Sequence, residues 1–255
     1  MKQKNMFFLL FLMAAGMSGA YAQYYRFDPF VGGEKMIGID VGTGFWLGNS
    51  DVKIIDNSYG PYSGYAAQSL KRPPFNPTVA LVYRRILDNG TVNWGNSYRV
   101  AFNWWSGTVE GVSGSNPTNT FTTDYKYRNL ELTDLYYIMI PIGDQFFVNA
   151  GGGLSLGLNM APKSTISYSD GSASVDTEGG LDFMDMISAQ IDFVVGADYL
   201  LSDNISLSAN FIGYAFDFFG LFADGEEKGF RGVGEGLYVS KKFPAQFTVG
   251  VTFHL

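Results

Sequence analysis

Residues 146–159 read FFVNAGGGLSLGLN, and this stretch shows the pattern that decides the fold. Every second residue is apolar or Gly, namely Phe146, Val148, Ala150, Gly152, Leu154, Leu156 and Leu158. The residues between them are mostly small or polar, namely Phe147, Asn149, Gly151, Gly153, Ser155, Gly157 and Asn159. Because successive side chains of a β-strand point to opposite faces, the stretch predicts a strand with one apolar face and one small or polar face.

The same alternation recurs along most of the chain. Eight segments carry it, namely 37–47, 79–84, 98–104, 120–142, 146–159, 187–198, 205–211 and 246–255. The connections are long at about 49–76, 106–119, 160–183 and 217–244, and short at 88–93, 141–144 and 202–204. Alternating strands joined by long loops at one end and tight turns at the other are typical of transmembrane β-barrels.

We therefore predict an all-β fold, a closed antiparallel transmembrane β-barrel of eight strands. A soluble β-sandwich also alternates, but its exposed face would be the polar one. Closure matters in a bilayer because every backbone N–H and C=O must be bonded within the protein. Ten strands are the alternative count, since 232–240 could form a strand before Pro244. We interpret that stretch instead as an extension of the last strand above the membrane.

The N-terminus has the three parts of a secretory signal peptide. Lys2 and Lys4 precede an apolar run, and small residues at Ala20 and Ala22 follow it. This order predicts cleavage before Gln23, so that residues 1–22 are a cleaved signal peptide. Residues 23–255 are then expected to form an outer-membrane β-barrel domain.

The composition excludes several kinds of site. The 255 residues include no Cys and one His, which excludes disulfides, thiolate metal sites and sites built from several His ligands. Loss of Lys2 and Lys4 with the signal peptide lowers the net charge from −7 to −9. An acidic exported chain lacks the basic footprint that nucleic acids require. We expect no metal, no cofactor and no nucleic-acid partner.

Aromatic residues lie near the expected strand ends, where a membrane barrel carries two girdles of them. The candidates are Phe45, Trp46, Trp94, Trp104, Trp105, Phe146, Tyr199 and Phe253.

Two adjoining stretches, 130–141 (LELTDLYYIMIP) and 143–155 (GDQFFVNAGGGLS), resemble the small outer-membrane β-barrel or "porin family" proteins of Gram-negative bacteria. The terminal strand with Phe253 also resembles the signal that barrel-assembly machinery reads, although His254 and Leu255 stand where an aromatic residue is more usual. The resemblance implies a location in the cell outer membrane. It implies contact with outer-membrane lipids and lipopolysaccharide, and with assembly machinery during biogenesis. Its motifs are architectural and bring no active site.

Two short motifs look catalytic in isolation. Residues 153–157 fit the G-x-S-x-G pattern of hydrolases, with Asp198 and His254 following in hydrolase order. That motif needs a sharp strand-to-helix turn, whereas here the alternation continues through Ser155. Residues 37–44 (IGIDVGTG) match a phosphate-binding strand, but their glycines fall on alternate positions, as in a crowded barrel interior. We predict no catalytic residues and no enzyme activity.

The remaining candidate site is a set of polar residues predicted to face inward. They are Asp40, Arg84, Arg99, Asn103, Asn149, Gln190, Asp192, Asp198 and Asn210. They could form a mutually paired plug, because buried charges must be paired, or a polar conduit. An eight-stranded barrel has an interior just filled by side chains, which favours the plug.

Two further features leave alternatives open. Asp134 shares the apolar face of 120–142, so it faces lipid, contacts a partner protein, or marks a β-bulge that shifts the register; we favour the bulge. The acidic loop at 160–183 could bind a cation or a basic partner, although a solvated loop is the simpler interpretation.

Two functions from different classes follow. The first is a structural or interaction role in the cell envelope, through extracellular loops or as a subunit of a larger outer-membrane complex with other outer-membrane proteins. The second is a narrow passive channel for ions or small solutes. A lipid-modifying enzyme ranks below both, because His254 lies at the periplasmic end of the expected barrel.

Overall fold

The computed structural model describes residues 34–46, 52–54, 62–71, 75–88, 93–143, 145–160, 163–172, 174–178, 186–218, 230–234, 237–240 and 244–255. The predicted signal peptide lies outside the described residues, so its cleavage stays a prediction.

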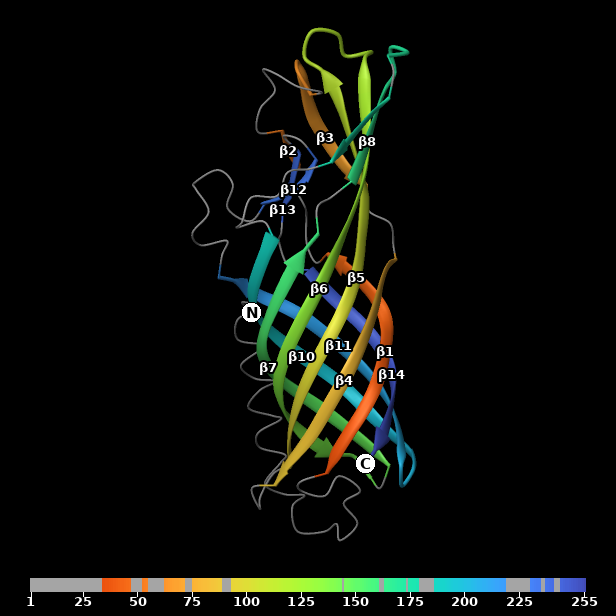
Figure 1. Cartoon of the computed structure of the whole chain (residues 1–255), viewed down its shortest axis with the longest axis vertical. Helices are drawn as coiled ribbons and strands as arrows, with labels where there is room; N and C mark the ends of the chain where they lie inside the picture. The colour runs from red at the N-terminus through yellow and green to blue at the C-terminus, as the bar shows by residue number, and fades with distance from the viewer. Residues whose placement is uncertain are drawn as a thin grey trace, which may run out of the picture.

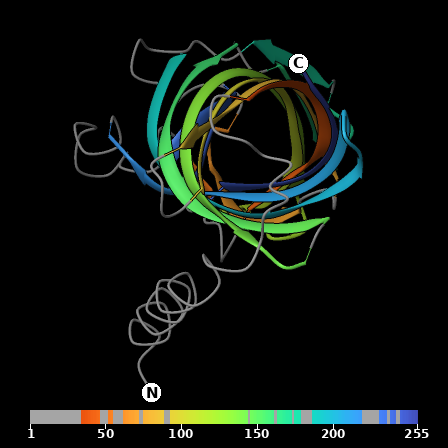
Figure 2. The same ribbon diagram turned by 90° about the horizontal axis from the view of Figure 1, so that it is seen from below.

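Eight strands form a closed antiparallel barrel (Figures 1 and 2). They are β1 (Lys35–Trp46), β4 (Asn76–Asp88), β5 (Asn93–Ser113), β6 (Thr120–Pro141), β7 (Phe146–Asn159), β10 (Ile187–Ser202), β11 (Ile205–Asp217) and β14 (Pro244–His254). Each pairs with the next in this order. The ring closes where β14 pairs with β1 without a break, from Met36 opposite His254 to Trp46 opposite Pro244. The predicted class and the count of eight strands are confirmed.

One end of the barrel has tight turns, as the spacing predicted. Between β6 and β7 the Ile142 N–H donates to the Phe146 carbonyl at 2.7 Å, and Gly143 adopts a φ of 87°. Few residues other than Gly adopt this left-handed conformation at low cost, which explains the Gly at this point of the turn. Between β10 and β11 only Asp203 and Asn204 intervene. We call this end the turn end; both Lys35 and the C-terminus lie there.

The other end differs most from expectation, because the predicted loops contain strands. The predicted loop 106–119 is mostly strand, since β5 and β6 have 21 and 22 residues and continue past the barrel. They are joined there by β3 (Tyr65–Lys71) beside β5, by β8 (Lys163–Tyr168) beside β6, and by β9 (Val175–Glu178) beside β8. We call the part of this sheet beyond the barrel the projecting sheet (Figure 1).

A second small sheet corrects the interpretation of 232–240. β12 (Phe230–Gly234) pairs with β13 (Leu237–Ser240), which pairs with β2 (Val52–Ile54). The stretch is therefore neither an extension of β14 nor a pair of additional barrel strands. Its pairing partner comes from a segment far away in sequence, which alternation alone does not reveal.

The two faces of the barrel differ as predicted. Outward positions carry exposed aliphatic side chains, such as Leu81 (60% exposed), Leu154 (56%) and Leu156 (58%). Inward positions carry buried residues, which are polar or small along much of the barrel and apolar toward the turn end. In the described part of the chain, no helix is long and apolar enough to cross a membrane.

Most of the predicted girdle residues are exposed on the outer wall, including Trp94, Trp104, Phe146, Tyr199 and Phe253. Phe45 is half-buried against Phe211, and the Trp46 side chain lies outside the described residues. Trp105 is the error: it is buried and belongs to the core of the projecting sheet. Two adjacent residues of one strand cannot share a face, so only one of Trp104 and Trp105 can point outward.

Candidate functional site

All nine residues of the predicted polar set are buried inside the barrel. They come from six of the eight strands, because every barrel strand turns alternate residues toward the same narrow interior. The structure brings most of them into hydrogen-bonded groups, and it adds Glu131, Tyr214 and Gln246.

The first group crosses the barrel. Arg84 on β4 donates from Nη1 to Asp198 Oδ1 on β10 at 2.6 Å, and both side chains are almost fully buried. β4 and β10 lie on opposite sides of the ring, so this ion pair spans the lumen. Asn149 donates to the other Asp198 oxygen at 2.8 Å. Both carboxylate oxygens of Asp198 are therefore satisfied.

The second group crosses the barrel at other strands. Arg99 on β5 donates to Gln246 Oε1 on β14 at 2.7 Å, and its guanidinium lies 3.5 Å from Glu131 on β6. The Tyr214 hydroxyl on β11 donates to Glu131 at 2.8 Å, and Gln246 Nε2 donates to Glu131 at 3.3 Å and to the Tyr214 hydroxyl. Period-two alternation already places Glu131 and Gln246 on the inner face, so sequence reasoning could have included both.

A third group lies nearer the projecting end. Thr78, Asn103, Asn129 and Asn159 are linked by hydrogen bonds of 2.8–3.1 Å that step from β4 through β5 and β6 to β7. Asn103 is thus part of a ladder along the wall and not of the pairs that cross the lumen.

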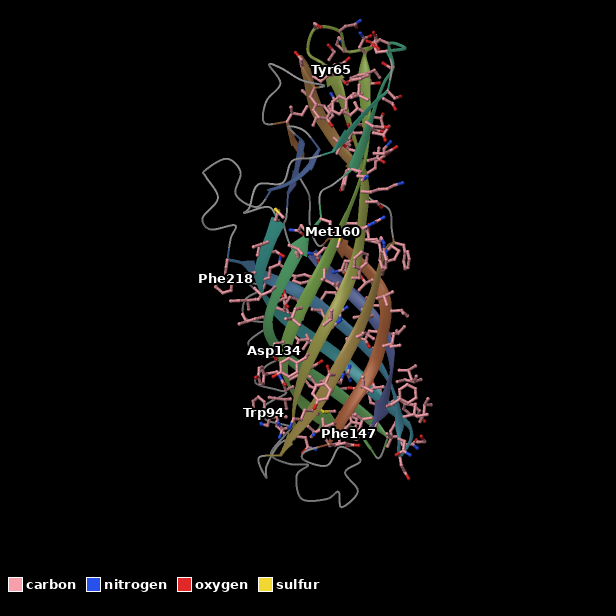
Figure 3. All side chains as sticks on the ribbon, in the orientation of Figure 1. Tyr65, Trp94, Asp134, Phe147, Met160 and Phe218 are labelled. Carbon is pink, nitrogen blue, oxygen red and sulfur yellow. The ribbon has the colours of Figure 1, made fainter. Side chains whose placement is uncertain are left out.

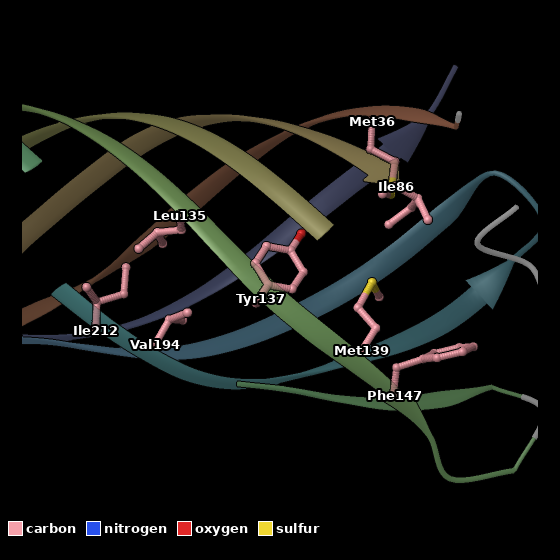
Figure 4. Packing of buried hydrophobic residues seen from close by; sticks show 8 residues of the cluster. All are labelled: Met36, Ile86, Leu135, Tyr137, Met139, Phe147, Val194 and Ile212. Atoms are coloured by element: carbon pink, nitrogen blue, oxygen red, sulfur yellow. The ribbon is translucent and has the colours of Figure 1, made fainter. Parts of the chain in front are cut away.

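An apolar plug fills the lumen toward the turn end (Figure 4). It consists of Met36, Ile86, Leu135, Tyr137, Met139, Phe147, Val194 and Ile212. Between this plug and the ion pairs lies a cavity of about 20 Å³, lined by Asp40, Arg84, Arg99, Asn149 and Asn210 among others. A space of this size holds about one water molecule. The structure therefore has a filled lumen and no open conduit through its described residues.

Several buried polar atoms border this filled interior without a partner among the described residues. Six of these atoms, which lack a hydrogen bond, belong to residues that line the cavity: Asp40 Oδ1, Arg84 Nε, Arg99 Nε and Nη1, Tyr137 Oη and Asn149 Oδ1. Asp192 accepts one hydrogen bond from Ser155 at 3.2 Å, and its other oxygen has no described partner. Buried polar groups are costly when unsatisfied, so an ordered water in the cavity would stabilise this region.

The residues of the hydrolase-like motif do not form a catalytic arrangement. Ser155 lies within the continuous strand β7 and donates to Asp192. His254 lies at the turn end of β14, where its ring nitrogens contact Glu34 at 2.7 Å and Ser206 at 3.2 Å. β10 and β11 separate β7 from β14. Among the described residues, no three His, Asp or Glu side chains are grouped so as to hold a metal ion.

The projecting sheet has one apolar and one polar face. On the apolar face Tyr62, Trp105, Val109, Phe121, Tyr125 and Ile166 form a buried core. On the opposite face one row runs in register across all five strands, namely Lys71, Thr108, Asp124, Thr165 and Asp176. Within the row Thr108 donates to Asp124 at 2.5 Å, and Thr165 donates to Asp176 at 2.8 Å. The predicted acidic loop is thus partly a sheet with an exposed row of hydroxyls and charges.

An ion pair between this row and the next holds the edge strand β3. Lys71 Nζ lies 2.5 Å from Glu110 on β5, and Ser69 donates to the other Glu110 oxygen at 3.2 Å. The hydrogen bond from Lys71 holds the pKa of Glu110 below its ordinary value.

The outward face of β6 changes character along its length. From Leu130 to Ile140 this face is apolar or aromatic except at Asp134. From Thr120 to Arg128 the same face carries hydroxyls and charges. The change is abrupt within one continuous strand, so it marks a boundary between two environments.

Asp134 points outward, and the predicted β-bulge is wrong. β6 pairs with β5 and β7 around this position without a register shift, with Asp134 opposite Tyr98 and Leu154. Figure 3 shows Asp134 on the barrel between Met160 near one rim and Trp94 near the other. Asn96 on β5 donates to its Oδ1 at 2.7 Å.

Comparison with known proteins shows distant structural likeness only. No protein-family model and no curated protein matches the chain. Ail, the attachment invasion locus protein of Yersinia pestis, is 12% identical over 88% of this chain and 100% of its own, with a TM-score of 0.37. Neisserial surface protein A is 10% identical over 86% and 96%, with a TM-score of 0.41. The translocator domain of the autotransporter NalP from Neisseria meningitidis is 14% identical over 94% and 95%, with a TM-score of 0.34.

Proposed function

We propose that this chain is an outer-membrane β-barrel protein that acts in the cell envelope by binding other molecules through its projecting sheet. The observation that carries the proposal is the change along the outward face of β6, from apolar residues on the barrel to charged and hydroxyl residues beyond it. A lipid bilayer around the barrel and water around the sheet account for both halves of one strand.

The closed barrel supports the membrane part of this proposal. Its wall exposes Leu, Ile, Val and Phe side chains over every barrel strand, which would be unfavourable in water over so large an area. The ring of strands leaves no unpaired barrel edge, as a bilayer requires.

Basic residues lie where the barrel would leave the membrane. Lys126, Arg128 and Lys163 follow directly beyond the apolar part of β6 and β7. These basic side chains suit the phosphate groups of lipopolysaccharide at the membrane surface.

The projecting sheet supports the binding part. Its polar face offers a flat row of hydroxyl and charged groups at Lys71, Thr108, Asp124, Thr165 and Asp176. Its edge strands β3 and β9 each pair on one side only within the described sheet. An exposed strand edge can accept an additional strand from a partner. A sheet held away from the membrane on two long strands is therefore suited to contact molecules outside the cell.

The filled lumen argues against the channel as the main function. The ion pair from Arg84 to Asp198 and the apolar plug with Phe147 obstruct the path at successive levels. We also propose that the protein is not an enzyme, since Ser155 and His254 lie on strands that are not neighbours and contact other residues.

Intact cells test the orientation. A short epitope inserted between Asn116 and Pro117, in the turn that joins β5 and β6, should be detected by antibody without permeabilisation. An epitope inserted beside Asp203, in a turn at the other end of the barrel, is the matched control and should be detected only after permeabilisation. The reverse result would contradict the proposed orientation.

Photo-crosslinking tests the binding role. A photoreactive residue at Thr165, between Asp124 and Asp176 in the polar row, should give an adduct of discrete mass on intact cells. The same residue at Ser172, an exposed turn position outside the row, is the control. Replacing Asp124 and Asp176 by Ala should remove the Thr165 adduct. Equal adducts at both positions, or an adduct that survives these replacements, would contradict binding by the row.

A further inference from the structure

Asp134 has an environment that neither the fold nor the projecting sheet explains. On the outward face of β6 it lies between Leu132 and Tyr136, and opposite Leu154 of β7. Leu132 and Leu154 are both more than half exposed, so this part of the wall faces the surroundings of the barrel. If the barrel spans a membrane as proposed above, the carboxylate faces the hydrocarbon region, where an ionised group is costly.

The neighbouring residues satisfy only part of this carboxylate. Among the described side chains, the neutral amide of Asn96 hydrogen-bonds to Asp134 Oδ1 at 2.7 Å. Asn96 is itself held almost fully buried and also donates to the Leu135 carbonyl. No described cation forms an ion pair with Asp134: on the same outward face, Arg85 of β4 stands opposite Asn96 and is two strands away from β6. The Asn96 amide therefore holds one oxygen of a carboxylate that is half-buried on the outward face.

Aromatic rings frame the carboxylate. Tyr98 stands directly opposite Asp134 on β5, and Tyr136 is its neighbour on the same face of β6; both are nearly half exposed. Tyr83 of β4 stacks beside Tyr98 with ring centroids 6.4 Å apart. A carboxylate beside exposed aromatic faces is complementary to a cation, because the rings and the carboxylate both attract positive charge.

We propose that Asp134, Asn96, Tyr98 and Tyr136 form a docking site for a basic side chain, Arg or Lys, on a membrane-spanning segment of a partner protein. We call these four residues the wall site. The proposal rests on the proposed function, because it requires the barrel wall to be within a membrane. Charge complementarity selects this occupant. A second copy that presents the same face about a two-fold axis would bring two Asp134 carboxylates toward each other, which opposes such a contact.

A reconstituted system tests the wall site with a defined probe. The barrel, labelled at a Cys introduced at Ile142, is placed in phosphatidylcholine vesicles with a labelled synthetic helix of about 20 Leu and Ala residues that spans the bilayer. The natural chain has no Cys, so the label is unique. One helix has a single Arg at its centre, and the control helix has Leu at that position. Resonance energy transfer between the label on the barrel and the label on the helix measures their association.

We expect the Arg helix to associate on the order of tenfold more tightly than the Leu helix. Asp134→Asn should abolish the preference, since the amide keeps the shape but loses the charge. Tyr98→Leu should weaken it. The matched control restores a carboxylate one outward position away, by adding Leu132→Asp to Asp134→Asn, and should not restore the preference. Equal association of both helices with the natural barrel, or full restoration by the displaced carboxylate, would overturn the wall site.

Two further measurements separate the possible failures. A folded barrel resists unfolding by detergent until it is heated. A change in electrophoretic mobility on heating therefore verifies that each variant is folded and inserted. If the natural barrel fails to insert at all, the membrane function proposed above is overturned and not only the wall site. If barrels labelled with donor and acceptor associate with each other and Asp134→Asn prevents this, the occupant is a second copy and the basic partner is overturned.

Discussion

Arg84 and Asp198 are almost fully buried, and their ion pair joins opposite walls of the barrel. Asp198 also accepts a hydrogen bond from Asn149, so loss of Arg84 would leave a buried carboxylate with only a neutral partner. We expect Arg84→Leu to lower the free energy of unfolding by about 3–5 kcal/mol, as is typical when one member of a buried pair is removed. Urea titration of the barrel in detergent micelles measures this change.

The double variant is the informative control for this pair. With Arg84→Leu and Asp198→Leu together, no unpaired charge remains, so the free energy of unfolding should return to within about 1 kcal/mol of the natural value or exceed it. If the double variant is as unstable as the single one, the cost lies in packing and not in the unpaired charge.

Gly95 shows how tightly a narrow barrel is packed. It stands opposite Tyr137, whose buried ring occupies the space that a Cβ at position 95 would need. We expect Gly95→Ala to lower the free energy of unfolding by about 1–3 kcal/mol, the usual cost of overpacking. Gly114→Ala is the control, because a Cβ there meets only the Gly64 carbonyl at 3.6 Å. Adding Tyr137→Leu should relieve the Gly95→Ala variant; no relief would show that the ring is not the obstacle.

At the scale of the strand, alternation predicted the barrel well, because the face to which a side chain points depends only on its position along its own strand. In β7 a side chain faces either the wall or the lumen, so its position in the sequence decides its environment. The same rule places Asp40, Arg84 and Asp198 inside. It could not show that Arg84 meets Asp198, because that contact depends on the closure of the ring and on two strands far apart in sequence.

The projecting sheet was missed for a related reason. Residues 106–119 have an outward face rich in Ser, Thr and Glu, so they lack the apolar alternation of the barrel. Residues 106–113 nevertheless continue strand β5, because Val109, together with Trp105 and Phe121, turns toward a shared core on the other face. That core includes Tyr62 and Ile166 from distant segments, and no local pattern reports such contacts.

The edge strand β3 should respond to acid. Its contact with β5 includes the Lys71–Glu110 pair, and the hydrogen bond from Lys71 depresses the pKa of Glu110 in the folded protein. The stabilisation of β3 is therefore complete above the ordinary pKa of Glu, near 4.3, and is lost as the pH falls through the depressed folded value. Hydrogen exchange of the β3 amides, corrected for intrinsic rates, should show reduced protection across this acidic interval.

Glu110→Gln is the control for β3, because Gln keeps a polar side chain that does not titrate. In this variant, protection of β3 should be lower at neutral pH and should not change between pH 6 and pH 3. A pH response that persists in Glu110→Gln would assign the effect to another carboxylate, such as Asp124 in the neighbouring row.

The whole molecule combines a filled barrel with a projecting sheet that is built on it. We expect the barrel to fold without the projecting sheet, but not the sheet without the barrel. β5 and β6 pair without interruption from the barrel into the projecting sheet, so the barrel provides the base on which the sheet forms. Replacing residues 107–125 by a two-residue turn would remove the central hairpin. We expect this variant to keep the mobility shift of a folded barrel on heating and to lose the Thr165 crosslink. Failure to fold would instead show that the sheet stabilises the barrel.

Conductance decides whether the filled lumen is also closed to ions. In the natural protein, a solute would have to displace the Arg84–Asp198 pair and pass the plug at Phe147. The cavity of about 20 Å³ between them holds about one water, not a continuous file. We expect no discrete single-channel steps from the refolded protein in a planar bilayer. A variant with Arg84→Ser, Asp198→Ser and Phe147→Ala is the comparison: steps that appear only in this variant would assign the barrier to these residues, and continued silence would assign it to the Arg99 group and the rest of the plug. Reproducible steps from the natural protein would overturn the closed lumen and make its polar residues a conduction path.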